Sequence, residues 1–213
     1  LILLSANVCF FYSISVISLP KALTLAFVAP LIVTAFSPVF LGETVGFRRW
    51  SAVVIGFIGS LIVIRPGFVE INLASLAALG TGVMYGFYLI ITRKLSTSDN
   101  PLLTLLFTGV VGTFIISIFM PFVWVSPTLS QWSMMISLGI FASIGHLLLI
   151  LSLKYADASK LAPLSYFEII TNIIIGYYFF NDFPDNWTFL GLFIIVLSGI
   201  YISRRGHLVK KIK

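Results

Sequence analysis

The residue whose chemistry stands out most in this sequence is Glu168, an acidic side chain inside the apolar stretch 161–180. As a helix rising ~1.5 Å per residue, a stretch of about 20 residues crosses the ~30 Å hydrocarbon core of a bilayer. A carboxyl group at that depth costs about 2.5–3.5 kcal/mol to insert, so it should meet a partner inside the protein. We therefore expect Glu168 to face the interior of a helical membrane protein.

Polar residues lie close to Glu168 along the same stretch. Asn172 is four residues further on and shares a helix face with it, and Ser165 and Tyr166 lie within a turn. Pro163, near the start of the helix, would leave carbonyl groups without helical donors. Two interpretations stay open: a site for a substrate amine or a transported proton, and a neutral structural carboxyl hydrogen-bonded to Asn172 or to a neighbouring helix.

Further candidates lie on three other apolar segments. His146 sits at mid-membrane depth in its segment, where it suits either a proton relay or a structural hydrogen bond. The remaining candidates could stack on a planar or cationic ligand or simply pack between helices: Tyr85, Tyr88, Asn7 and Tyr12. With two histidines in the whole sequence and no ligand spacing, we predict neither a metal site nor a cofactor.

Composition decides which class of protein must position these residues. The chain is 59% hydrophobic and only 9% charged, whereas soluble domains carry about 25% charged residues. We therefore predict an all-α polytopic membrane protein that binds no nucleic acid, despite its net charge of +6. Eight transmembrane helices are expected near residues 1–18, 22–41, 50–64, 73–92, 102–124, 132–153, 161–180 and 187–203.

Basic residues between these segments predict the orientation in the membrane. Loops on one side hold only Lys21 and Arg65. The other side holds the rest: Arg48, Arg49, Arg93, Lys94, Lys154, Lys160, Arg204, Arg205, Lys210, Lys211 and Lys213. Lys and Arg concentrate in cytoplasmic loops, so we expect the C-terminus in the cytoplasm, most simply at a bacterial inner membrane.

A repeat of charged positions predicts an internal symmetry. Three positions in the first part of the chain recur 139 residues later (160−21, 182−43 and 204−65): Lys21, Glu43 and Arg65 match Lys160, Asp182 and Arg204. Each matched pair falls on opposite sides of the membrane, as in the inverted repeats of secondary transporters. Helix-length spacing alone is the alternative. The offset predicts an N-terminally truncated chain with eight of ten helices in a 5+5 arrangement.

This offset also predicts the domain organisation and the packing elements. Residues 1–67 would hold the last three helices of the first repeat, 72–205 the complete second repeat, and 206–213 a basic cytoplasmic tail. Small residues at Gly82 and Gly86 suit close helix contact. Pro30 and Pro38 predict a kink in the segment 22–41, with a gating hinge as a further interpretation.

Several stretches resemble one transporter family. They are LGETVGFRRWSAVVIGFIG at 41–59 with RPG at 65–67, LAPLSYFE at 161–168, FNDFPD at 180–185, and SGIYI at 198–202 followed by Arg204. The sequence resembles the EamA-type transporters of the drug/metabolite transporter superfamily, and within it the subgroup that includes S-adenosylmethionine uptake proteins. The resemblance implies ten helices with both ends in the cytoplasm and a central cavity between two five-helix halves.

The function predicted from the sequence is secondary active transport by alternating access. The substrate would be a small organic metabolite such as an amino acid, a nucleoside or an S-adenosylmethionine-like compound, and the partners would be that substrate and the lipid bilayer. A homodimer is left open. The alternative is a truncated membrane fragment or scaffold without transport activity. A membrane-embedded enzyme is disfavoured, because the sequence has no His-Glu-x-x-His or Gly-x-Ser-x-Gly motif.

Overall fold

The computed structural model describes residues 1–42, 46–64, 72–96, 100–155, 171, 174–179, 181 and 184–210, without the side chains of residues 20, 48, 49, 64 and 202–210. Within these ranges all regular elements are helices, which confirms the predicted all-α class. The chain divides into two compact units. The hairpin unit consists of Thr92–Ala156 with Leu1, and the main unit of Ile2–Ile91 and Asp157–Lys213.

The main unit holds most of the described helices. They are α1 (Ile2–Ile14), α2 (Leu19–Ala26), α3 (Ala29–Leu41), α4 (Phe47–Ile64), α10 (Asn186–Lys210) and most of α5 (Leu73–Leu95), whose last turn belongs to the hairpin unit. The core is formed by small and branched apolar side chains that these helices bury against one another, among them Ala22, Leu25, Val63 and Ala78. The fold is thus a layered arrangement of helices joined by apolar contacts.

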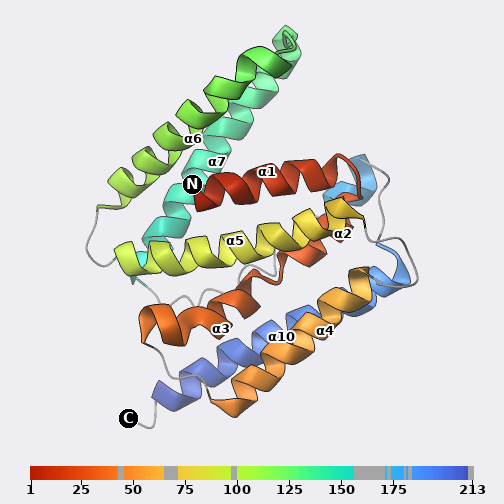
Figure 1. Ribbon diagram of the computed structural model, residues 1–213, viewed down its shortest axis with the longest axis vertical. Helices are drawn as coiled ribbons and strands as arrows, with labels where there is room; N and C mark the ends of the chain where they lie inside the picture. Colours follow the sequence, from red (N-terminus) through yellow and green to blue (C-terminus); the bar gives the residue numbers. More distant parts are fainter. Residues whose placement is uncertain are drawn as a thin grey trace. The chain divides into compact units, whose positions relative to one another are not determined.

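Helices α4 and α10 lie side by side in Figure 1 and meet at two glycines. A Cβ added to Gly59 would lie 3.0 Å from the carbonyl oxygen of Gly191. A Cβ added to Gly191 would lie 2.6 Å from the carbonyl oxygen of Gly59 and would also meet the Val63 side chain. Both glycines therefore let two backbones approach more closely than any side chain would allow.

The segment expected as one helix over 22–41 is two helices. Helix α2 ends at Ala26, Phe27 and Val28 form a turn, and α3 begins at Ala29 with Pro30 in its first turn. Proline has no N–H, so the Ala26 carbonyl oxygen loses the donor that an uninterrupted helix would supply four residues later. The turn is buried, with Val28 2% exposed and Phe27 8% exposed.

The second proline of this segment leaves the helix intact. Pro38 lies inside α3 and removes the donor to the Thr34 carbonyl oxygen. The Ser37 hydroxyl donates a hydrogen bond to that oxygen at 3.2 Å. Helix α3 then ends at Gly42, whose left-handed backbone (φ +67°) places its N–H on the Ser37 carbonyl oxygen. A serine hydroxyl beside a proline thus replaces a missing backbone donor.

Helix α5 packs its glycines against the α2–α3 turn. A Cβ added to Gly82 would lie 2.6 Å from the Ala26 carbonyl oxygen and 2.6 Å from a methyl of Val28. One turn later, a Cβ added to Gly86 would meet the Ala29 carbonyl oxygen at 3.0 Å. The hydrogen that Gly82 carries in place of a Cβ therefore points toward the oxygen that Pro30 leaves without its helical donor, a geometry typical of Cα–H···O contacts.

The hairpin unit consists of two long helices, α6 (Pro101–Val123) and α7 (Leu129–Tyr155), which lie side by side in Figure 1. Their ends are capped by side chains: Asn100 accepts a hydrogen bond from the Leu102 N–H at 3.0 Å, and Gln131 accepts one from the Thr128 N–H at 2.8 Å. Each cap satisfies a backbone donor that the first turn of a helix leaves over.

The last turn of α5 is fixed to the end of α7 within this unit. The Leu153 carbonyl oxygen accepts hydrogen bonds from the Arg93 guanidinium and, at 3.3 Å, from the Ser96 hydroxyl. The same hydroxyl also donates to the Arg93 carbonyl oxygen at 2.8 Å. Since a carbonyl in the last turn of a helix has no helical donor, this pair of polar side chains closes the C-terminal end of α7.

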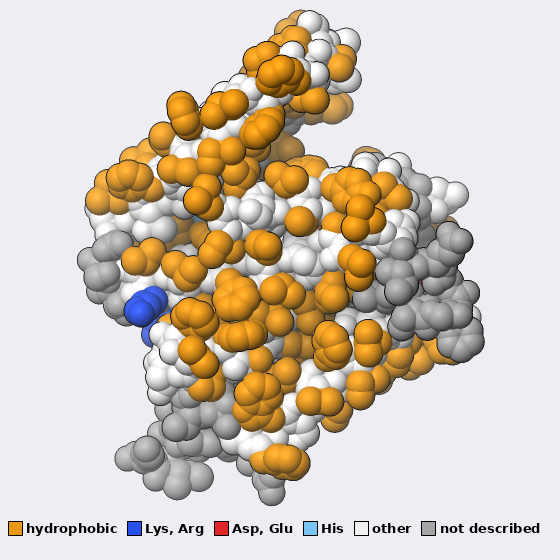
Figure 2. Space-filling view, viewed as in Figure 1, with side chains coloured by type: hydrophobic (Ala, Val, Ile, Leu, Met, Phe, Trp, Pro, Cys, Tyr) orange, Lys and Arg blue, Asp and Glu red, His pale blue; other side chains and the backbone are white. Residues whose placement is uncertain are grey.

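The lengths and surfaces of the helices are those of membrane spans. Among the described residues, four stretches are long and apolar enough to cross a bilayer: Lys21–Leu41, Leu73–Leu95, Pro101–Val123 and Leu129–Tyr155. In α6 and α7 most large apolar side chains are exposed, as at Phe107 (68%) and Phe141 (74%). Figure 2 shows hydrophobic side chains distributed over the whole visible face of the described residues, with few charged side chains among them. Such a surface suits contact with lipid rather than water.

The packing of α5 generates a prediction with a control on the same helix. Gly82→Ala should lower the thermal stability of the detergent-purified protein, because the new methyl collides with the α2–α3 backbone and overpacking costs about 1–3 kcal/mol. Gly80→Ala should be neutral or stabilising, because no atom lies within 4 Å of its Cβ position. Thermal unfolding of both variants, followed by size-exclusion chromatography, measures the difference. Equal midpoints for the two variants would contradict this account of the contact.

Candidate functional site

The group predicted around the acidic residue lies outside the described residues. This applies to Pro163, Ser165, Tyr166, Glu168 and Asn172. Their roles stay predictions. The candidates that the structure describes lie on α1, α5 and α7.

Tyr85 and Tyr88 form a stacked pair on α5. Their ring centroids are 6.0 Å apart and the ring planes differ by 24°, a geometry that offset-stacked aromatic pairs prefer. Tyr88 is buried at 7% exposure, whereas Tyr85 is only half-buried. The buried ring therefore fixes the orientation of its accessible neighbour, since the two are held on one helix at a spacing of three residues.

Tyr85 is accessible although it lies on the inward face of its helix. At ~100° per residue, Tyr85 falls between Thr81, Gly82 and Tyr88 on the helical wheel, and all three of these flanking residues are buried. A residue in the middle of a buried face would normally be buried as well. The structure thus places a partly accessible aromatic ring among buried residues of α5 in the main unit.

The neighbouring residues of α5 tie this face to α1. The Thr81 hydroxyl donates to the Ala77 carbonyl oxygen at 3.1 Å and approaches the Ala6 carbonyl oxygen of α1 at 3.3 Å. On the opposite side, Phe87 contacts Phe36 of α3 with ring centroids 4.9 Å apart. Helix α5 is therefore held from two sides, and its tyrosines keep a fixed place between these contacts.

The two candidates of α1 are not brought together. Asn7 and Tyr12 are both exposed in the described structure, and Tyr12 has 43% of its surface accessible. Five residues apart, they point about 140° away from each other around the helix. The face of α1 that packs inward carries Ala6 and Ser13 instead. A joint role for Asn7 and Tyr12 in one ligand site is therefore disfavoured by the helix geometry.

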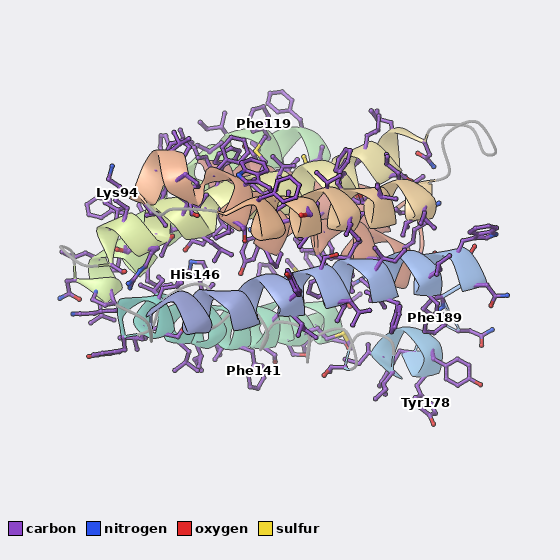
Figure 3. The ribbon with its side chains drawn as sticks, turned by 90° about the horizontal axis from the view of Figure 1, so that it is seen from below. Lys94, Phe119, Phe141, His146, Tyr178 and Phe189 are labelled. Atoms are coloured by element: carbon purple, nitrogen blue, oxygen red, sulfur yellow. The ribbon has the colours of Figure 1, made fainter. Side chains whose placement is uncertain are left out.

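His146 lies on α7 in the hairpin unit and is half-buried. Figure 3 shows its side chain leaving α7 on a different side from Phe141, which is 74% exposed. This difference matches the angle of about 140° that five residues subtend on a helix. His146 thus faces away from the most exposed apolar side of α7, and its predicted part in a proton relay stays a prediction.

Small hydroxyl side chains recur among the buried residues of the described helices. Among the described residues, the buried polar side chains are all serines and threonines. Most satisfy a carbonyl of their own helix, as Thr34 does with Pro30 at 3.0 Å and Ser13 with Cys9 at 2.7 Å. For Thr34 the signal in the sequence is its position four residues after Pro30, where its hydroxyl can reach the Pro30 carbonyl oxygen. These hydroxyls bond to backbone carbonyls inside the protein without adding charge.

No group of three or more His, Cys, Asp and Glu side chains that could hold a metal ion occurs in the described ranges. The main unit offers aromatic rings, hydroxyls and an interrupted helix there. Aromatic rings of this kind can stack on a planar part of a small molecule.

Named relatives in bacteria share this sequence over most of its length. An S-adenosylmethionine uptake transporter of Rickettsia bellii is 28% identical over 206 residues, covering 94% of this chain and 70% of the relative. A riboflavin transporter of Vibrio cholerae is 30% identical over 186 residues, covering 86% of this chain and 62% of the relative. A pseudopaline exporter of Pseudomonas aeruginosa is 26% identical, and this chain covers 70% of its length. The chain thus spans about two thirds of the length of these relatives.

A solved crystal structure has the same fold. It superposes with a TM-score of 0.62 at 19% sequence identity, covering 95% of this chain and 74% of the other. The EamA-like transporter family matches residues 1–65 and 72–204. Because that match includes nearly all of the sequence and the helices have the length and apolar surface of membrane spans, the chain belongs to the EamA-like transporter family and is a multi-pass membrane protein.

Proposed function

We propose that this protein is a secondary active transporter that moves a small organic metabolite across a bacterial inner membrane by alternating access. The observation that carries the proposal is the family match over residues 1–65 and 72–204. The interrupted helix α2–α3 supports it, because discontinuous helices with displaced backbone carbonyls commonly build the midplane sites of such transporters. The accessible inward-facing Tyr85 supplies a surface for the cargo.

The names of the relatives narrow the class of substrate. S-adenosylmethionine, riboflavin and pseudopaline are small polar organic molecules, and the named proteins include both uptake transporters and an exporter. We infer a polar metabolite of comparable size for this chain. Amino acids, nucleosides and S-adenosylmethionine-like compounds fall in this class.

We propose that a proton gradient drives transport and that the Glu168 carboxyl group binds and releases the coupled proton. A carboxyl group within an apolar span is costly unless it has a function or a fixed partner, and protonation removes its charge during the passage between the two sides. Asn172 on the same helix face and His146 on α7 are the proposed auxiliary groups. Pro163, Ser165 and Tyr166 would complete the site around the carboxyl group.

An inverted repeat is the proposed architecture behind this mechanism. The 139-residue offset pairs Gly59 with Ser198 and Ala52 with Gly191. Gly59 contacts Gly191 in the structure, so a twofold relation would place Ala52 opposite Ser198, and both of these residues are 5% exposed. The burial of both residues supports repeats at 1–67 and 72–205. The distribution of Lys and Arg supports a basic tail at 206–213 and a C-terminus in the cytoplasm.

Uptake by intact cells tests the proposed function. Cells expressing the chain should accumulate at least one labelled compound from a panel of amino acids, nucleosides, riboflavin and S-adenosylmethionine above the level of cells with empty vector. The full-length relative from Rickettsia bellii is the positive control. Uptake at the vector level for the whole panel, with the protein present in the membrane fraction, would instead support a scaffold without transport activity.

The role of the carboxyl group gives a sharper prediction. Glu168→Gln should reduce proton-driven uptake at least about tenfold while leaving expression and thermal stability unchanged, because glutamine keeps the shape but cannot release a proton. Asp185→Asn is the matched control. The Asp185 carboxylate accepts a hydrogen bond from the Thr188 N–H at the start of α10, and asparagine caps a helix equally well. If Glu168→Gln transports with the wild-type rate and pH dependence, Glu168 is structural.

The repeat can be tested by cross-linking across α4 and α10. In a Cys9→Ala background, cysteines at Ala52 and Ser198 should form a disulfide or a short bismaleimide cross-link under mild oxidation, because the twofold relation places them opposite each other. Cysteines at Ala52 and Leu190 are the control, since Leu190 lies about two helical turns from Ser198. Mass spectrometry of the digested protein measures both pairs. Equal yields for the two pairs would argue against the twofold relation.

A further inference from the structure

We propose that Tyr85 is the surface on which the transported molecule stacks a planar heteroaromatic ring, and that Tyr88 holds Tyr85 in place for this contact. The inference rests on the proposed transport function and specifies the substrate class for the site on α5. It starts from the contrast between the two tyrosines, of which Tyr88 is buried and Tyr85 half-buried.

The orientation of the Tyr85 ring is fixed before any ligand arrives. The two rings lie 6.0 Å apart at 24°, so the buried Tyr88 supports its neighbour over one face. A tyrosine side chain has few rotatable bonds, and a packed neighbour removes most of the remaining freedom. Little conformational entropy is then lost when a ligand stacks on the ring, which favours affinity.

Contacts of neighbouring residues hold α5 in place around Tyr85. Gly82, Gly86 and Phe87 bind α5 to the α2–α3 pair, and the Thr81 hydroxyl joins α5 to α1. Tyr85 keeps accessible surface although its neighbours on this face of α5 are buried, and this surface is the proposed contact for the cargo molecule.

Stacking on the ring indicates the chemistry of the ligand. An aromatic side chain that stacks favours a planar ring system with a delocalised π face. Fused nitrogen heterocycles such as adenine and isoalloxazine have such a face and fall in the class of polar metabolites proposed as cargo.

The test uses pairs of probes that differ only by the heterocycle. Adenosine is compared with ribose, riboflavin with ribitol, and S-adenosylmethionine with S-methylmethionine. Equilibrium binding of each labelled probe to the purified full chain in detergent is measured by scintillation proximity. We expect at least one heterocyclic probe to bind, and its counterpart without the ring to bind at least about tenfold more weakly.

Variants of Tyr85 then locate the contact. Tyr85→Leu should lower the affinity for the heterocyclic probe about tenfold or more. Tyr85→Phe, which keeps the ring, should have an affinity within about threefold of wild type. Tyr178→Leu, at a tyrosine that is 77% exposed, should change nothing. Should Tyr85→Leu elute as aggregate, Tyr85→Trp replaces it and should bind the probe at least as tightly as wild type.

Each of the following outcomes would overturn the inference: unchanged binding to Tyr85→Leu, equal binding of both members of every probe pair, or weaker binding to a folded Tyr85→Trp. Absence of binding for all three heterocyclic probes overturns it as well. These results leave the proposed transport function standing if the cell assay shows uptake of a compound without a heteroaromatic ring. Failure of uptake for every compound would instead remove the transport function itself.

Discussion

A backbone carbonyl in the hydrocarbon region must find a donor inside the protein, and much of the described structure follows from this requirement. Pro30 breaks the second apolar segment and leaves the Ala26 carbonyl oxygen without its helical donor. The turn at Phe27 and Val28 is shielded by α5, which approaches closely because Gly82 and Gly86 have no side chains. The position of α5 in turn decides where Tyr85 and Tyr88 point. One proline thus constrains three helices and the candidate ligand surface.

Two ways of meeting this constraint occur within the same segment. At Pro38 the helix continues, because the Ser37 hydroxyl supplies the missing donor to the Thr34 carbonyl oxygen. At Pro30 the preceding residue is Ala29, whose methyl side chain cannot donate a hydrogen bond, and the helix is interrupted instead. Hydroxyl side chains elsewhere in the main unit also bond to carbonyls of their own helices. Glycines therefore let a neighbouring helix shield such carbonyls, and small hydroxyls donate hydrogen bonds to them, without the cost of burying charge.

The class of fold and most helix positions followed from the sequence because a bilayer imposes a length and a composition on every span. The segments expected at 73–92 and 102–124 are α5 (Leu73–Leu95) and α6 (Pro101–Val123). The division of 22–41 into two helices was expected only as a kink, since a proline does not show whether a neighbour will shield the freed carbonyl. The sequence placed Tyr85 and Tyr88 on one apolar segment and gave them equal weight. Only tertiary packing separates the buried ring from the accessible one. The predictions for Glu168 and Asn172 still depend on sequence alone.

We propose that this chain moves a small metabolite across a membrane in response to an ion gradient. The most direct measurement is solute uptake by proteoliposomes that contain the purified chain, with an imposed pH gradient and with the same gradient collapsed by an ionophore. The account predicts accumulation of at least one labelled metabolite above protein-free liposomes, and loss of that accumulation when the gradient is collapsed. The account would be contradicted if no compound accumulates under either orientation of the gradient, although the protein elutes as a folded species before reconstitution.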